Sequence, residues 1–205
     1  MDKWNQIASK ESVDKAIKAL QNNGIDAKFV NTGKDANKEV ISMIPEGAEV
    51  MTMSSVTLDT LEISKEVQEG NKYKSVKNKL NSMDRATQGL EMLKLEAAPQ
   101  WSVGSVHAVT EDGHVLIASN TGSQLPAYAS GAAHVIWVVG VQKIVKNTTK
   151  GMKRIYEYVL PLESERLNKL YNLTQGSFVS KLLIINREIK PGRITLIFVG
   201  EKLGF

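Results

Sequence analysis

One stretch, from Val103 to Gly140, constrains the fold of this chain more than any other part. It begins with two runs rich in β-branched residues on either side of Glu111-Asp112-Gly113. An Asp-Gly pair between such runs is typical of a β-hairpin. The stretch ends with the most apolar run of the chain, Val135 to Val141, which indicates a buried strand.

A polar loop lies between the hairpin and the buried strand, with the sequence Asn120-Thr121-Gly122-Ser123-Gln124. Its glycine lets the backbone approach a ligand closely, and its side chains offer neutral hydrogen-bond donors and acceptors. An ordinary turn closed by the Asn120 side chain is the structural alternative. We interpret the loop as a ligand-binding candidate, and expect Gly122→Val to abolish binding at little cost in stability.

The rest of the chain alternates between helical and extended patterns. Helices are predicted from Ser12 to Gly24, from Thr32 to Ile44, after Thr57, from Ser82 to Pro99 and from Asn147 to Pro161; strands are predicted at 26–30, 49–53, 181–186 and 193–199; and 71–81 is predicted to be an exposed connector. The last two strands are expected to pair as a second hairpin. This alternation predicts an α/β fold with a mixed sheet covered by helices.

A second polar loop, Ser54-Ser55-Val56-Thr57, joins a predicted strand to a predicted helix. Hydroxyl groups at positions 54, 55 and 57 can cap that helix or hold a phosphate or carboxylate. If both loops lie at the same edge of the sheet, they form one pocket for a small anion. Lys143 and Arg85 are candidate counter-charges for it.

Composition narrows the functional classes. The 205 residues predict a single domain over 1–205, since no linker-like segment interrupts them. The net charge is +4, but the basic residues carry no nucleic-acid-binding motif, so we expect no nucleic-acid partner. The start of the chain lacks a secretory signal and no run is long enough to span a membrane, which predicts a cytoplasmic protein. Cysteine is absent, so cysteine-ligated iron–sulfur clusters are not expected in this chain.

Several segments together resemble the LUD-domain family of lactate-utilisation (LutC-like) proteins. They are V-G-S-V-H-A-V-T-E-D-G from Val103, S-N-T-G-S-Q-L-P-A-Y-A from Ser119, H-V-I-W-V-V-G-V-Q-K-I-V from His134 and the ending from Leu182. The resemblance implies a Rossmann-like, largely parallel sheet flanked by helices, with hairpin additions. That fold is shared with ribose-5-phosphate isomerase, glucosamine-6-phosphate deaminase and the CoA transferases.

The resemblance also implies a function. Some relatives act with partner proteins that carry iron–sulfur clusters, in the oxidation of L-lactate to pyruvate. Their loop often reads E-T-G-T, whereas this chain has Asn120-Thr121-Gly122-Ser123, which argues against covalent chemistry of the CoA-transferase type. We therefore expect a domain that binds a small carboxylate or phosphorylated metabolite beside separate iron–sulfur partners.

Two other functional classes stay open. A stand-alone enzyme acting on a sugar phosphate or acyl-CoA would use Asp112 or Glu201 as its acid or base. A ligand sensor or assembly subunit would have no chemistry of its own, and a homo-oligomer is compatible with either class. His107, His114 and His134 are too poorly spaced for a metal site, so we expect no metal and no bound cofactor.

Overall fold

The computed structural model describes residues 2–171 and 175–205 and contains two sheets rather than one. The larger sheet has six parallel strands in the order β1-β10-β7-β4-β2-β3. Its strands are β1 (Asp26–Val30), β2 (Glu49–Thr52), β3 (Lys74–Ser75), β4 (Trp101–Gly104), β7 (His134–Gly140) and β10 (Ile194–Val199). An α/β architecture with a largely parallel sheet, as the sequence predicted, is thereby confirmed.

The smaller sheet is mixed and has the order β8-β5-β6-β9. Its strands are β5 (Ala108–Thr110), β6 (Val115–Ser119), β8 (Ile144–Val145) and β9 (Lys181–Ile185). The predicted first hairpin is present, because β5 and β6 pair in antiparallel fashion around Gly113, whose φ is +83°. The predicted second hairpin is wrong: β9 pairs with β6, whereas β10 lies in the other sheet between β1 and β7.

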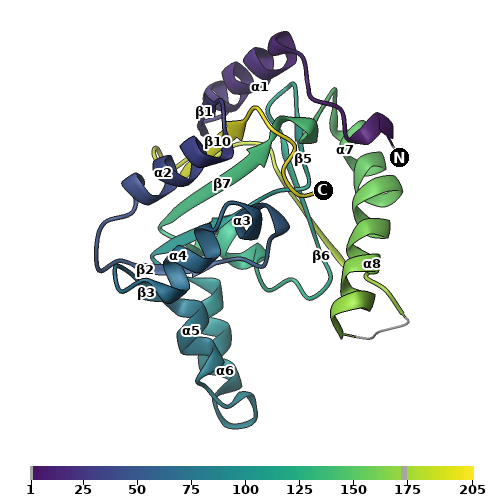
Figure 1. The fold of residues 1–205 in the computed structure, drawn as a ribbon. Coiled ribbons are helices and arrows are strands. Elements are labelled where there is room, and N and C mark those ends of the chain that lie inside the picture. Colours follow the sequence, from purple (N-terminus) through teal and green to yellow (C-terminus); the bar gives the residue numbers. More distant parts are fainter. Residues whose placement is uncertain (1, 172–174) are drawn as a thin grey trace.

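Helices cover both sheets in layers (Figure 1). They are α1 (Lys10–Asn22), α2 (Gly33–Met43), α3 (Val56–Thr60), α4 (Ile63–Glu69), α5 (Val76–Asn81), α6 (Arg85–Ala97), α7 (Thr148–Arg154) and α8 (Leu160–Tyr171). Short 3₁₀ or π turns are η1 (Asp2–Trp4), η2 (Ala127–Gly131), η3 (Val141–Lys143) and η4 (Ile155–Val159). The predicted connector at 71–81 is wrong, since it holds β3 and α5.

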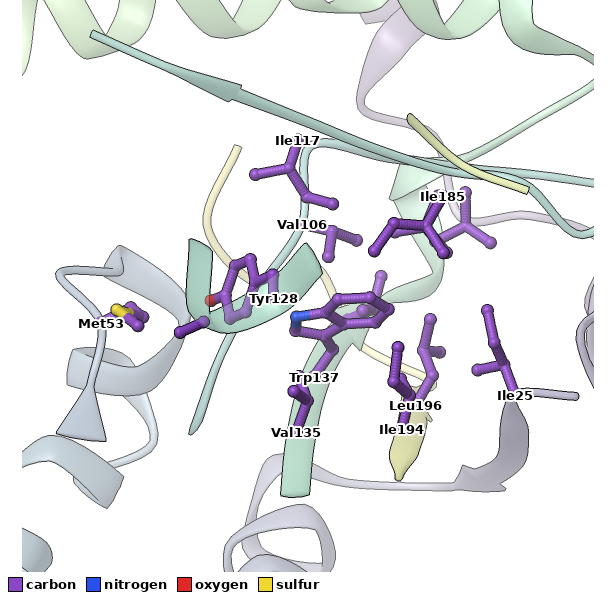
Figure 2. Close-up of a cluster of buried hydrophobic side chains, with 14 of the residues drawn as sticks. Ile25, Met53, Val106, Ile117, Tyr128, Val135, Trp137, Ile185, Ile194 and Leu196 are labelled. Atoms are coloured by element: carbon purple, nitrogen blue, oxygen red, sulfur yellow. The ribbon is translucent and has the colours of Figure 1, made fainter. Parts of the chain in front are cut away.

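Alternation along the central strands builds two cores. In β7, Trp137 and Val139 point to one face of the large sheet, and Ile136 and Val138 point to the other. The second face is covered by α2, α3 and α4. The first face packs against the small sheet, and Figure 2 shows Trp137 facing Ile117 of β6 across this interface.

The far side of the small sheet packs on the helical segment that starts at α7. Leu116 and Val145 of the sheet belong to one buried cluster with Ile155 of η4. The predicted end of this helix at Pro161 is wrong, because α7, η4 and α8 follow one another without a break to Tyr171. A proline has no N–H to donate, and the wide π turn immediately before it offers one way to keep the chain helical.

Two helix details also differ from the prediction. Helix α1 is capped by Ser9 rather than Ser12, because the helix begins at Lys10 and the Ser9 hydroxyl accepts the Ser12 N–H; the Ser12 hydroxyl instead donates to Glu111 of the hairpin at 2.7 Å. In α6 the leucines at helical spacing, a pattern that ordinarily faces a core, are turned outward, since Leu90 and Leu93 are 69% and 61% exposed. None of the described helices is both long and apolar enough to cross a membrane.

Candidate functional site

The two polar loops meet at one cavity of about 490 Å³. They come from different sheets, since one follows β2 of the large sheet and the other follows β6 of the small sheet. The expected shared edge of a single sheet is therefore wrong, although the loops do converge. Of the eight predicted ligand-binding residues, seven line the cavity: Ser54, Ser55, Thr57, Asn120, Thr121, Ser123 and Gln124.

The loop after β6 is closed by Ser119, which was not among the residues predicted from the sequence. Its hydroxyl donates to Gln124 Oε1 at 2.9 Å and accepts the Gly122 N–H at 2.8 Å. Gln124 is thereby occupied in holding the loop, and its amide nitrogen donates to the Ala118 carbonyl at 3.4 Å. Asn120 does not close the turn; its Oδ1 accepts from Ser180 at 3.2 Å.

Gly122 has a conformational role. Its φ of +88° lies in the left-handed region, and a β-carbon there would stand 2.5 Å from Lys181 Cδ. Gly122 is not part of the cavity wall, so a side chain at this position meets Lys181 instead of a ligand. The expectation that a substitution would cost little stability is therefore revised.

Gly122→Ala is expected to lower the free energy of unfolding by roughly 1 to 2 kcal/mol, because alanine is strained at this φ. Gly89→Ala is the matched control: Gly89 lies inside α6, and nothing stands within 4 Å of the added carbon. That variant should gain roughly 0.5 to 1 kcal/mol. Urea unfolding of both proteins tests the pair, and equal stabilities would contradict it.

The loop after β2 is held by its own hydroxyls. Ser55 caps α3 by accepting from the Leu58 N–H, and the buried Thr57 donates to the Leu203 carbonyl at 3.2 Å. Ser54 accepts from Lys77 at 3.4 Å. Capping, the structural alternative for this loop, therefore explains Ser55, while Thr57 connects the loop to the C-terminal segment.

Lys143 brings a cation to the cavity from η3, directly after β7. The residue is only 2% exposed, and its Nζ lies 3.1 Å from Ser105 Oγ and 3.3 Å from Thr57 Oγ1. Burial, helped by the charge of Arg154, lowers the pKa of Lys143 to about 7. Arg85, the other candidate counter-charge, begins α6 and does not line the cavity.

Arg154 adds a second buried positive charge behind the cavity wall. It is fully buried, and its Nη1 donates to the His107 carbonyl at 2.6 Å. Among the described residues its Nε and Nη2 have no hydrogen-bond partner, and its guanidinium lies 5.2 Å from the Tyr158 ring. Burial lowers the pKa of Arg154 to about 10, which leaves it charged at neutral pH. Within residues 2–171 and 175–205, no acidic group is ion-paired with Arg154 or Lys143.

His107 also lines the cavity, in the segment that joins β4 to β5. Its Nδ1 accepts the Ala118 N–H at 3.1 Å. Burial, with the charges of Lys143 and Arg154, lowers the pKa of His107 to about 3, so its ring is neutral. From the sequence, His107 was a candidate only for metal binding, and neither His107 nor Ser105 was predicted to line this cavity. The signal in the sequence is that Ser105 and His107 are polar residues at alternate positions just after the end of β4, where side chains can point into a site.

The two proposed acids lie away from this cavity. Asp112 is in the hairpin turn, with its side chain 57% exposed and 3.9 Å from His114. Glu201 follows β10 and accepts from the Gly33 N–H at the start of α2. Neither residue lines the cavity, so the structure does not bring them together with the loops.

The three histidines are dispersed. His107 lines the cavity, His114 lies beside Thr148, and His134 stacks on Trp101 with ring centroids 4.2 Å apart. In the part of the chain that the structure describes, no group of three or more histidine, aspartate or glutamate side chains is placed to hold a metal ion.

Comparisons with known proteins identify related chains. The family model described as LUD domain matches residues 13–199. A solved structure of a DUF162 family protein from Deinococcus radiodurans is similar over 95% of this chain and 99% of its own, with a TM-score of 0.60 and 10% identity. No curated protein matches the chain. The structural similarity supports the fold, and at this identity it supports nothing further.

Proposed function

Because the chain belongs to the LUD-domain family, we propose that it is a lactate-utilisation-type domain whose cavity binds a small anionic metabolite. The observation that carries the proposal is Lys143, a buried amine at the cavity with two neutral hydroxyls as its hydrogen-bond partners. A buried cation without an ion-pair partner is costly, and a bound anion would offset that cost.

The surroundings of Lys143 favour an anion further. Arg154 adds positive charge behind the wall, and His107 is neutral. Glu163, an acidic side chain that lines the cavity, is held by Arg166 through two hydrogen bonds of 2.7 Å. Small carboxylates and phosphorylated metabolites are the ligand classes that suit such a site.

We expect affinity for an anion of constant charge, such as sulfate, to fall as pH rises through about 7. Lys143 is charged below this pH and neutral above it, so affinity should drop by up to tenfold per pH unit on the alkaline side. Among the described residues, the other charged side chains around the cavity are Arg154, Lys77, Glu163 and Arg166, and Phe205, whose backbone carboxyl ends the described chain, belongs to the same lining. Calorimetric titration across the neutral range tests the proposal, and a flat profile or no binding would reject it.

In this proposal, oxidation of L-lactate would require separate redox partners. The chain has no cysteine to ligate an iron–sulfur cluster, so the two electrons released when lactate becomes pyruvate would pass to another protein. Co-purification with a cluster-bearing protein under native conditions is the test. The stand-alone enzyme with Asp112 or Glu201 as acid or base is less favoured, because both residues lie outside the cavity.

A further inference from the structure

We propose that the cavity selects an oxo carboxylate with an apolar tail, whose carbonyl oxygen accepts a hydrogen bond from His107 while its carboxylate lies against Lys143. This inference rests on the proposed function and names the ligand class of the same site. It assigns to His107 the role of distinguishing a carbonyl group from other substituents beside the carboxylate.

The tautomer of His107 is fixed by its backbone contact. A backbone N–H can only donate, so the Nδ1 that accepts from Ala118 at 3.1 Å carries no proton. The proton of the neutral ring therefore resides on Nε2. Since His107 lines the cavity, this nitrogen presents an uncharged N–H that can donate and cannot accept.

The groups around Lys143 supply more donors than acceptors. A protonated amine has three N–H bonds, of which Thr57 and Ser105 receive two. The Thr57 hydroxyl proton is already given to the Leu203 carbonyl. With respect to the residues that the structure describes, one N–H of Lys143 and the N–H of His107 are left for a ligand.

A ligand that only accepts hydrogen bonds matches this arrangement. The carboxylate and carbonyl oxygens of an oxo acid accept and do not donate. The hydroxyl of the corresponding hydroxy acid brings a proton that also needs an acceptor. An unsubstituted acid leaves the His107 N–H without a partner, which costs about tenfold in affinity.

The opposite wall indicates the rest of the ligand. Apolar side chains from η4 and α8 line the cavity, among them Ile155, Val159 and Leu167. At about 490 Å³ the cavity falls within the range of sites for ligands larger than a three-carbon acid. An apolar tail on the ligand would pack against these side chains and remove them from water, whereas a second charged group would be poorly solvated beside them.

Three acids with one carbon skeleton test the inference: ketoisocaproate, hydroxyisocaproate and isocaproate, which differ only at the carbon beside the carboxylate. Calorimetry with the wild-type protein should show ketoisocaproate binding about tenfold more tightly than isocaproate, with the hydroxy acid between them. The Lys143→Met variant should show no measurable binding of any of the three acids. Pyruvate, which lacks the tail, should bind more weakly than ketoisocaproate.

Substitutions of His107 separate its two contacts. In His107→Asn, the amide oxygen can accept from the Ala118 N–H, but no N–H group lies at the former Nε2 position. The affinity for ketoisocaproate should therefore fall about tenfold, to that for isocaproate, and the affinity for isocaproate should stay unchanged. His107→Gln carries an amide nitrogen near that position and should recover part of the preference. His114→Asn, in the hairpin between β5 and β6 and outside the cavity, should leave the ranking of the three acids intact.

Different outcomes reject different claims. Equal wild-type affinities for the three acids, or a preference that survives in His107→Asn, overturn the inference while anion binding stands. Tighter binding of inorganic phosphate than of any carboxylate overturns the ligand class. Failure of every anion to bind rejects the proposed function itself. If His107→Asn does not fold, as circular dichroism would show, the wild-type ranking and His107→Gln decide.

Discussion

Replacing Arg193 by methionine is expected to lower the free energy of unfolding by about 3 to 5 kcal/mol. Arg193 pairs with Glu188 at 2.6 Å, and the two side chains are 4% and 8% exposed. Its remaining N–H groups donate to the carbonyls of Tyr128, Ala129 and Ala132, at 2.7 to 3.2 Å. The substitution leaves a buried carboxylate and these carbonyls without their donor.

Urea unfolding of Arg193→Met measures this loss, with Arg187→Met as control, because Arg187 is exposed on the same connection. The double variant Glu188→Gln/Arg193→Met should recover part of the stability, since it removes the unpaired charge. A loss below about 1 kcal/mol in the single variant would show that the pair is dispensable.

Acid should weaken the same contact. Burial raises the pKa of Glu188, but hydrogen bonds from the Lys190 N–H and Arg193, together with the Arg193 charge, outweigh it, so the pKa lies below its ordinary value. The carboxylate therefore stabilises the fold above its ordinary pKa of 4.5, and this contribution is lost as pH falls through the lower folded value.

Lys143→Met is expected to have opposite effects on binding and on stability. Anion affinity should fall about a hundredfold, because the buried charge that meets the ligand is gone. The free energy of unfolding should rise by about 1 kcal/mol or more, since an apolar side chain of similar length replaces a desolvated amine. Lys146→Met, an exposed lysine three positions away, should change neither property.

The pH dependence of stability gives an independent check. The folded pKa of Lys143, about 7, lies below the ordinary 10.5, so between these values the unfolded chain binds the proton and the folded chain does not. Stability should therefore rise with pH across this window in the wild type. Urea midpoints of Lys143→Met should lack that rise; if the slope persists, Lys143 is not its source.

Elements whose partners lie nearby in the sequence could be predicted, and elements with distant partners could not. The first hairpin was readable because its turn, Glu111-Asp112-Gly113, lies between the strands it joins. The second was misread because the partners of β9 and β10 are far away in sequence, in β6 and in β1 and β7. The exposure of one face of α6 could not be predicted for the same reason. Periodicity shows that Leu90 and Leu93 lie on one face of the helix, but it does not show whether another element covers that face.

The lining of the candidate cavity was predicted in part, and the limit has a related cause. Polar loops after strands could be recognised, and seven of the eight residues chosen line the cavity. Lys143 could be named as a candidate from the sequence. Its direction toward the cavity could not, because it depends on the turn η3 and on the hydrogen bond to Thr57, which is distant in the sequence. The donor role of His107 could not be predicted, because its tautomer depends on a contact with Ala118 of β6, which the sequence around His107 does not reveal.

The position of β10 has a consequence for the order in which the chain can fold during synthesis. Strand β1 is synthesised more than 150 residues before its neighbour in the sheet, β10 at Ile194–Val199. The same late strand supplies the other side of β7. The six-stranded sheet therefore cannot be completed until β10 has been synthesised, and until then the strand edges of β1 and β7 that it covers are open to aggregation.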